Sequence, residues 1–386
     1  MNKTLIFLID AVRPDYINEK DTPFLNEIEV YPVKSLLGYS CGIHPSIWTG
    51  TYQQDHGAFL IFYYDPENSP FKWTKSLKFI PNFIRKYFIA GLKFPYYAFP
   101  EFRPILPKFI KKILPLPPAV PLDIAPYFST GGIEPKGKDF FQILAENEIS
   151  YSRQGDYVNR YVDEVKKLED LKITKKKIDY YYLYWADHYG HWKGPNSKPV
   201  RDYLRKVDQK IKELYREAKE KSKQVDLFVF SDHGMCKIKE YNNVQKYLKN
   251  SKFKIKKDYL PFYDSTLARF WILNEKIREE FIKFVRQIPK LTYLDERLLK
   301  KYGINFKNKK TYGEVICLSD PEVRIYPDYF APLHGGVKGL HGFDPEFPDS
   351  KGIFISNCVS LKKEIKIVDI LPILLKQLGL NFSKIC

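Results

Sequence analysis

Two segments of the chain each place an acidic residue and a histidine just beyond a short apolar run. The run LFVF directly precedes Ser231, Asp232 and His233, and the run DYYYLYW ends two residues before Asp187, with His191 four residues further on. Both runs are too short for a buried helix and rich in aromatic or β-branched residues, which predicts buried strands. Carboxylate and imidazole groups are therefore expected where these strands end.

Three further positions could contribute to the same site. Asp10 follows the apolar residues 4–9, and His341 lies in a glycine-rich stretch that also holds His334. Ser40 lies in a small-residue turn before an expected helix, where helix N-terminal N–H groups would favour an attacking hydroxyl and those of residues 41–43 could hold a phosphoryl oxygen. Taken alone, the acid and the serine equally fit helix caps. The surroundings of Ser40 do not match the GxSxG pattern of a Ser-His-Asp hydrolase.

Together these positions predict a metal centre. The acids Asp10, Asp187 and Asp232 and the histidines His191, His233 and His341 give carboxylate and imidazole ligands in equal number. Such a set suits Zn²⁺, with Mn²⁺ as second choice, and suits Ca²⁺ or Mg²⁺ poorly. Six ligands and the Ser40 oxygen would serve two ions, and a pair about 3.5–4 Å apart clamps both oxygens of an in-line displacement at phosphorus.

The elements that must position these residues alternate between strands and helices. Strands are expected over residues 4–9, 33–37, 179–185, 227–230 and 352–356, and helices over residues 22–25, 139–149, 158–171, 198–223 and 366–378. A strand, a long helix and another strand form a βαβ unit, which implies parallel strands. The expected fold is α/β, a mostly parallel central sheet flanked by helices. Ligands bind at the carboxyl edge of such sheets.

Two insertions are expected within a single α/β domain over residues 1–386. Residues 58–130 are crowded with aromatic residues, proline and lysine, and residues 236–330 are less regular, with an expected strand over 266–273, a helix over 274–287 and a hairpin of 313–318 with 323–326. The first insertion suits either a lid packed on the sheet or a basic aromatic surface in peripheral contact with a membrane. The second is interpreted as a cap.

Composition narrows the range of possible binding partners and locations. The 386 residues carry 63 basic and 46 acidic side chains, a formal charge of +17, which favours an anionic partner such as a phosphate ester. No recognisable nucleic-acid-binding module is present, so specific nucleic-acid binding is not expected. The five cysteines form no CxxC pair, which points to a reducing, cytoplasmic location. No apolar run of 18 residues predicts a transmembrane helix.

The ordered set resembles the alkaline phosphatase superfamily, and within it the nucleotide pyrophosphatase/phosphodiesterase-like branch. The resemblance rests on Asp10, Ser40, Asp187-x-x-x-His191, Asp232-His233 and Gly-x-His341-Gly342, with support from Thr22-Pro23, Thr49-Gly50, Asp55-His56-Gly57 and residues 368–380. It covers both ends of the chain but not residues 58–130 or much of residues 236–330. It implies an alkaline phosphatase-like fold with one metal held by Asp187, His191 and His341, and a second held by Asp10, Asp232, His233 and the Ser40 oxygen.

The implied activity is hydrolysis of phosphate esters, most closely a phosphodiesterase or pyrophosphatase with Ser40 as nucleophile. The branch typically has threonine where Ser40 stands, whereas monoesterases and phosphomutases of the superfamily use serine, so monoester chemistry stays open. Nucleotides and lipid head groups both fit as substrates. A non-enzymatic membrane-surface module built on residues 58–130 is a further alternative, although no expected metal ligand is missing.

Overall fold

The computed structural model describes residues 2–77, 91, 114–117, 119–155, 168–330, 336–361 and 364–381. It divides the chain into two compact units. The first consists of Met1–His56, Pro135–Ile238 and Val337–Cys386, and the second consists of Gly57–Glu134 and Lys239–Gly336. The second unit is thus made of two segments that interrupt the first in sequence.

The first unit is built on a seven-stranded sheet with the order β17-β2-β16-β7-β1-β6-β5. Its strands are β1 (Asn2–Ile9), β2 (Val30–Lys34), β5 (Tyr151–Gln154), β6 (Ile178–Leu183), β7 (Gln224–Phe230), β16 (Gly352–Ser356) and β17 (Ile365–Lys366). Strands β5, β6, β1 and β7 run parallel to one another, and β16 runs antiparallel to both of its neighbours, β7 and β2. The sheet is therefore mostly parallel, as the sequence predicts.

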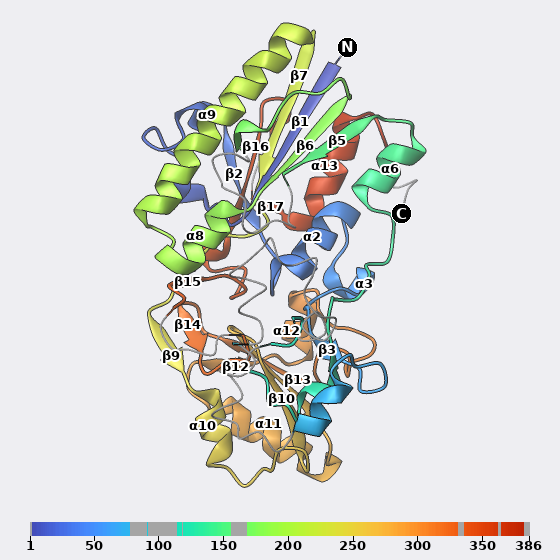
Figure 1. Cartoon of the computed structure of the whole chain (residues 1–386), viewed down its shortest axis with the longest axis vertical. Coiled ribbons are helices and arrows are strands. Elements are labelled where there is room, and N and C mark those ends of the chain that lie inside the picture. The colour runs from blue at the N-terminus through green and yellow to red at the C-terminus, as the bar shows by residue number, and fades with distance from the viewer. Residues whose placement is uncertain are drawn as a thin grey trace. The chain divides into compact units, whose positions relative to one another are not determined.

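Helices cover both faces of this sheet, because its central strands are apolar on both faces (Figure 1). The helices are α1 (Pro23–Asn26), α2 (Ser40–Thr49), α3 (Gln53–His56), α6 (Phe140–Glu146), α8 (Trp185–Lys193), α9 (Lys198–Lys221) and α13 (Ile370–Gln377). In β1, Leu5, Phe7 and Ile9 share a core with α9, whereas Ile6 and Leu8 share a core with α2, α6 and α13. Successive residues of this strand thus point to opposite faces of the sheet and pack against two different layers of helices.

The carboxyl ends of the central strands meet at one edge. Ile9 of β1 is paired with Leu183 of β6, and Leu8 is paired with Phe230 of β7. Beyond β7, the short strand β8 (Cys236–Lys237) pairs with β15 (Gly339–Leu340), which brings the segment after residue 336 back to this edge. The residues that follow these strand ends therefore lie close together.

The second unit has a four-stranded antiparallel sheet with the order β10-β11-β13-β12. Its elements are β3 (Tyr63–Tyr64), β4 (Phe128–Ser129), β9 (Glu240–Asn242), β10 (Tyr259–Tyr263), β11 (Leu267–Ile272), β12 (Leu291–Tyr293), β13 (Val315–Ser319), β14 (Val323–Ile325), α10 (Val244–Lys249), α11 (Arg278–Arg286) and α12 (Glu296–Lys301). Its core is strongly aromatic, and the ring of Phe128 contacts the rings of both Phe262 and Trp271.

Two sequence-based expectations about the elements are wrong. The second strand covers Val30–Lys34 instead of residues 33–37. The expected hairpin of residues 313–318 with 323–326 does not form, because β13 pairs with β11 and β12, whereas β14 pairs in parallel with β9.

Some expectations concern residues that the structure does not describe. The helix expected over residues 158–171 lies outside the described residues except for its last four, and so do His334 and residues 78–90 and 92–113 of the first insertion. Among the helices that are described, none combines the length and the apolar character needed to span a bilayer.

Candidate metal centre and nucleophile

All seven site residues predicted from the sequence lie in the first unit, at the carboxyl edge of its sheet. Asp10 follows β1, and Asp232 and His233 follow β7. The others lie on helices or follow a short strand: Ser40 begins α2, Asp187 and His191 lie on α8, and His341 follows β15.

Asp10, Asp232 and His233 form a fully buried group that could hold a metal ion. Nε2 of His233 lies 3.1 Å from Oδ2 of Asp232 and 3.4 Å from Oδ1 of Asp10. The candidate ligand atoms of the three residues all lie within 4.8 Å of one another. Two carboxylates and one imidazole therefore converge on one small volume.

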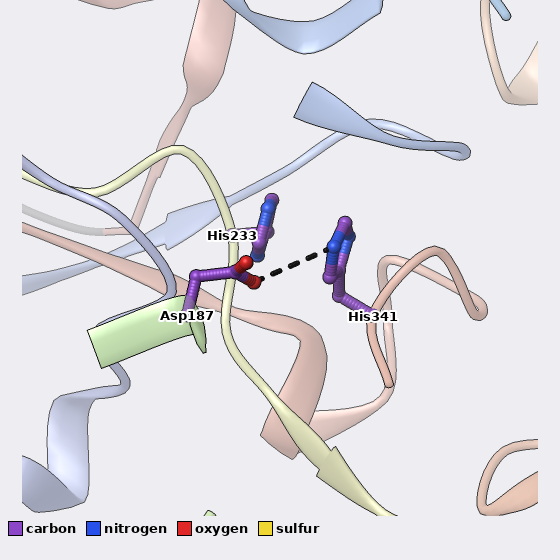
Figure 2. Close-up of side chains that lie close together, drawn as sticks. All are labelled: Asp187, His233 and His341. Atoms are coloured by element: carbon purple, nitrogen blue, oxygen red, sulfur yellow. Dashed lines mark ion pairs between the residues drawn. The ribbon is translucent and has the colours of Figure 1, made fainter. Parts of the chain in front are cut away.

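Asp187, His233 and His341 form a second such group (Figure 2). Oδ1 of Asp187 lies 3.6 Å from Nε2 of His341. The rings of His233 and His341 are stacked, with centroids 3.7 Å apart and an interplanar angle of 9°. His233 belongs to both groups, so the two candidate sites are adjacent.

His191 lies beside the second group. Its Nε2 is 3.2 Å from Oδ1 of Asp187, one helical turn earlier on α8, and its Nδ1 is 2.8 Å from the carbonyl oxygen of Gly339. A proton on Nδ1, donated to this carbonyl, leaves the lone pair of Nε2 available to a metal, as is usual for metal-binding histidines. The geometry thus permits His191 and His341 to serve as ligands beside Asp187.

The donor set fits a metal in one further respect. Among the described residues, Oδ1 of Asp10 and Oδ1 of Asp187 are buried and have no partner with hydrogen-bond geometry, although a histidine nitrogen faces each of them, that of His233 at 3.4 Å and that of His191 at 3.2 Å. Leaving buried polar atoms unpaired costs free energy, so such atoms need an explanation. A cation bound in each candidate group would satisfy the carboxylate oxygen that belongs to that group.

The electrostatics of the centre point the same way. Burial opposes the charge of His233, but Asp232, Asp10 and Asp187 outweigh it and raise the pKa of His233 to about 10. Burial and the charge of Asp232 raise the pKa of Asp10 well above its usual range. The three carboxylates therefore favour positive charge at this edge of the sheet.

Ser40 is placed against this centre. Its hydroxyl oxygen lies 3.0 Å from Nε2 of His233, and the residue is 8 % exposed. Tyr39 precedes it in an extended conformation, so α2 begins at the serine. The N–H groups of Gly42 and Ile43 both donate to the carbonyl of Tyr39, so they are not available to a phosphoryl oxygen as the sequence suggested.

Two residues of the site were missed by sequence reasoning. Nε2 of His44 lies 3.0 Å from Oδ2 of Asp232, and the hydroxyl of Tyr182 donates to Oδ2 of Asp10 at 2.5 Å. Each side chain supports one candidate metal ligand. His44 lies one helical turn after Ser40, a spacing that could have identified it.

Comparisons with known proteins show the family and the fold of this chain. The family model of type I phosphodiesterases/nucleotide pyrophosphatases matches residues 4–344. Human ectonucleotide pyrophosphatase/phosphodiesterase 5 has a similar structure, with a TM-score of 0.64 and 16% identity over 98% of this chain and 95% of that one. An inactive threonine-to-alanine variant of the murine protein, in complex with AMP, gives a TM-score of 0.63 and 17% identity over 99% of this chain and 96% of that one. The chain belongs to the type I phosphodiesterase/nucleotide pyrophosphatase family, a branch of the alkaline phosphatase superfamily whose members are phosphoric ester hydrolases.

Proposed function

We propose that this protein hydrolyses phosphodiester or pyrophosphate bonds with Ser40 as its nucleophile and two zinc ions as cofactors. The observation that carries the proposal is the 3.0 Å contact between the Ser40 hydroxyl and His233, the histidine shared by both candidate metal groups. A hydroxyl in this position would lie next to both ions. Among the described serines, Ser35 also reaches one of the six proposed ligands, but its hydroxyl donates to the backbone carbonyl of Asp232 and not to a side chain.

The proposed ligand sets follow the family pattern. Asp187, His191 and His341 would hold one ion, and Asp10, Asp232 and His233 with the Ser40 oxygen would hold the other. Three imidazoles among the ligands favour zinc over magnesium or calcium. Bound zinc would lower the pKa of a coordinated hydroxyl and neutralise charge on the reacting phosphoryl group.

The protein side chains then have defined tasks. The Ser40 hydroxyl gives up its proton to water, and Oγ forms a bond to phosphorus while the bond from phosphorus to the leaving oxygen breaks. The leaving oxygen takes up a proton from water and departs as an alcohol or a phosphate, and the phosphoryl group stays on Ser40. Water then displaces Ser40 and restores its hydroxyl. Burial of Ser40, His233 and Asp232 restricts competing water during the first step.

A nucleotide is the favoured class of substrate. The murine relative was solved with AMP, and the surplus of basic residues in this chain suits a polyanionic ligand. Hydrolysis of a phosphomonoester is a second candidate, because this chain has serine at position 40, the residue used by monoesterases of the superfamily.

One set of assays tests both candidates. Wild-type protein loaded with zinc is compared on bis-p-nitrophenyl phosphate and p-nitrophenyl phosphate, each with and without a chelator. We expect the diester to be hydrolysed faster than the monoester. The activity should be lost when the chelator is added and should return when zinc is restored. Faster turnover of the monoester would favour the second candidate, and no turnover of either would contradict both.

The role of Ser40 needs its own variants. Ser40→Ala should lower kcat about a thousandfold or more, because the nucleophile is absent, while the metal content stays near that of the wild type. Cys41→Ala is the matched control and should retain activity. A Ser40→Ala variant with wild-type kcat would exclude this serine as nucleophile, whatever the metal content.

A further inference from the structure

A small pocket opens beside the metal centre, within the first unit. It has a volume of about 290 Å³ and is lined by His44, Trp48, Arg153, Gln154, Gly155, Tyr180 and Tyr182. These residues belong to α2, to β5 and the residue after it, and to β6. The volume lies at the lower end of the range for ligand sites, so the pocket suits a small molecule.

The pocket offers a positive charge that is not neutralised within the described chain. Arg153 is exposed, and its guanidinium lies 4.4 Å above the ring of Phe141. Among the described residues, no carboxylate forms an ion pair with Arg153. The aromatic contact fixes the position of the guanidinium without neutralising its charge.

A second hydrogen-bond donor lies in the same pocket. Tyr180 is 6% exposed, and within the described part of the chain its hydroxyl forms no hydrogen bond. Burial raises the pKa of Tyr180 far above its usual value, so the hydroxyl remains protonated. The ring packs against Trp48 and Phe141, with centroids 5.2 and 5.4 Å away, which holds the side chain in place.

The opposite side of the pocket is connected to the metal centre. His44 contacts Asp232 at 3.0 Å, and Tyr182 donates to Asp10. The rings of His44 and Tyr182 also meet edge to face, with centroids 5.5 Å apart. A ligand in the pocket would therefore touch the two side chains that support both carboxylates of one candidate metal group.

We propose that this pocket binds a small phosphate-class anion, inorganic phosphate or a compact phosphomonoester, through Arg153 and the hydroxyl of Tyr180. The positive charge of Arg153 would repel a cation, and an apolar ligand would leave both side chains unpaired. A phosphomonoester is a product of phosphodiester hydrolysis, and binding of such an anion here would act on Asp232 and Asp10 through His44 and Tyr182. The site goes beyond the proposed hydrolytic function and can be tested without turnover.

The test measures the binding of inorganic phosphate to full-length protein stripped of metal by a chelator, so that no metal-bound phosphate contributes. Calorimetry and the fluorescence change of Trp48 are followed at constant ionic strength, with chloride as the reference anion. We expect saturable binding to the wild type, at least tenfold weaker binding to Arg153→Gln and weaker binding to Tyr180→Phe. Tenfold corresponds to about 1.4 kcal/mol.

Arg216→Gln is the matched control, because Arg216 is an exposed arginine on α9 with no ion pair among the described residues. It should bind phosphate as the wild type does, and circular dichroism checks that each variant folds. Equal binding by Arg153→Gln and the wild type would overturn the proposal, as would the absence of saturable binding or tighter binding of acetate than of phosphate. None of these outcomes depends on whether Ser40 is the nucleophile.

Discussion

Replacing His44 with alanine should weaken one metal site and spare the other. His44 contacts Oδ2 of Asp232, whereas Oδ1 of Asp232 accepts from the backbone N–H groups of Ala11, at 3.4 Å, and His233, at 3.0 Å. Nε2 of His233 also lies 3.1 Å from Oδ2, so the variant removes one of four contacts that orient this carboxylate. His44 has no contact of this kind with Asp187.

The size of the effect follows from these contacts. Loss of a residue that orients a metal ligand typically lowers metal affinity 10- to 100-fold. Because two backbone donors still hold Oδ1, we expect a loss near the lower bound, about tenfold or about 1.4 kcal/mol. The loss should affect only the ion held by Asp10, Asp232 and His233.

The assay is a zinc titration against a chromophoric chelator, which resolves two dissociation constants per chain. His188→Ala is the matched control, because His188 lies on α8 but outside both candidate metal groups. Activity of His44→Ala should recover when zinc is raised about tenfold. Wild-type affinity at both sites, or an equal loss at both, would refute the reasoning that His44 acts through Asp232.

Two further predictions concern stability. Burial lowers the pKa of His56 to about 4. Below pH 6.5 the unfolded chain therefore binds a proton at this histidine that the folded chain does not bind. The free energy of unfolding should fall between pH 6.5 and 4 by up to about 3 kcal/mol. In urea unfolding, the free energy of unfolding of His56→Gln should change less between pH 7 and 4.5 than that of the wild type. An equal change in both proteins would contradict this prediction. The buried Asp208 carboxylate accepts the N–H groups of Phe24 and Leu25 at 3.0 and 2.9 Å, so Asp208→Asn should cost about 1–2 kcal/mol. A melting temperature equal to that of the wild type would argue against this role, with Asp202→Asn on the exposed face of the same helix as the control.

The central strands could be predicted because their residues are apolar without interruption. The expected strands 4–9 and 227–230 lie within β1 and β7, whose residues are buried from both sides. In β2, buried residues alternate with partly exposed ones and Pro32 lies in the middle of the strand, whereas the predicted strand began only after this proline. Local hydrophobicity therefore identifies strands covered on both faces better than strands near the edge of the sheet.

The types of the site residues could be predicted, but not all of their surroundings. Sequence reasoning expected Asp187 and His191 just after a strand, whereas they lie one turn apart on α8, which presents both from one helix face. The contacts of His44 with Asp232 and of Tyr182 with Asp10 join segments more than 170 residues apart. Contacts between residues so far apart in the sequence depend on how the strands of the sheet are arranged, and a local sequence pattern does not predict them.

The interrupted first unit also bears on how the protein is made. Asp10 belongs to its first segment, Asp187 and Asp232 to its second, and His341 to its third. Strand β16, which lies between β7 and β2, also belongs to the third segment. During ribosomal synthesis the candidate group of Asp187, His233 and His341 therefore cannot be completed until the whole second unit has been translated, whereas Asp10, Asp232 and His233 all precede the second segment of that unit.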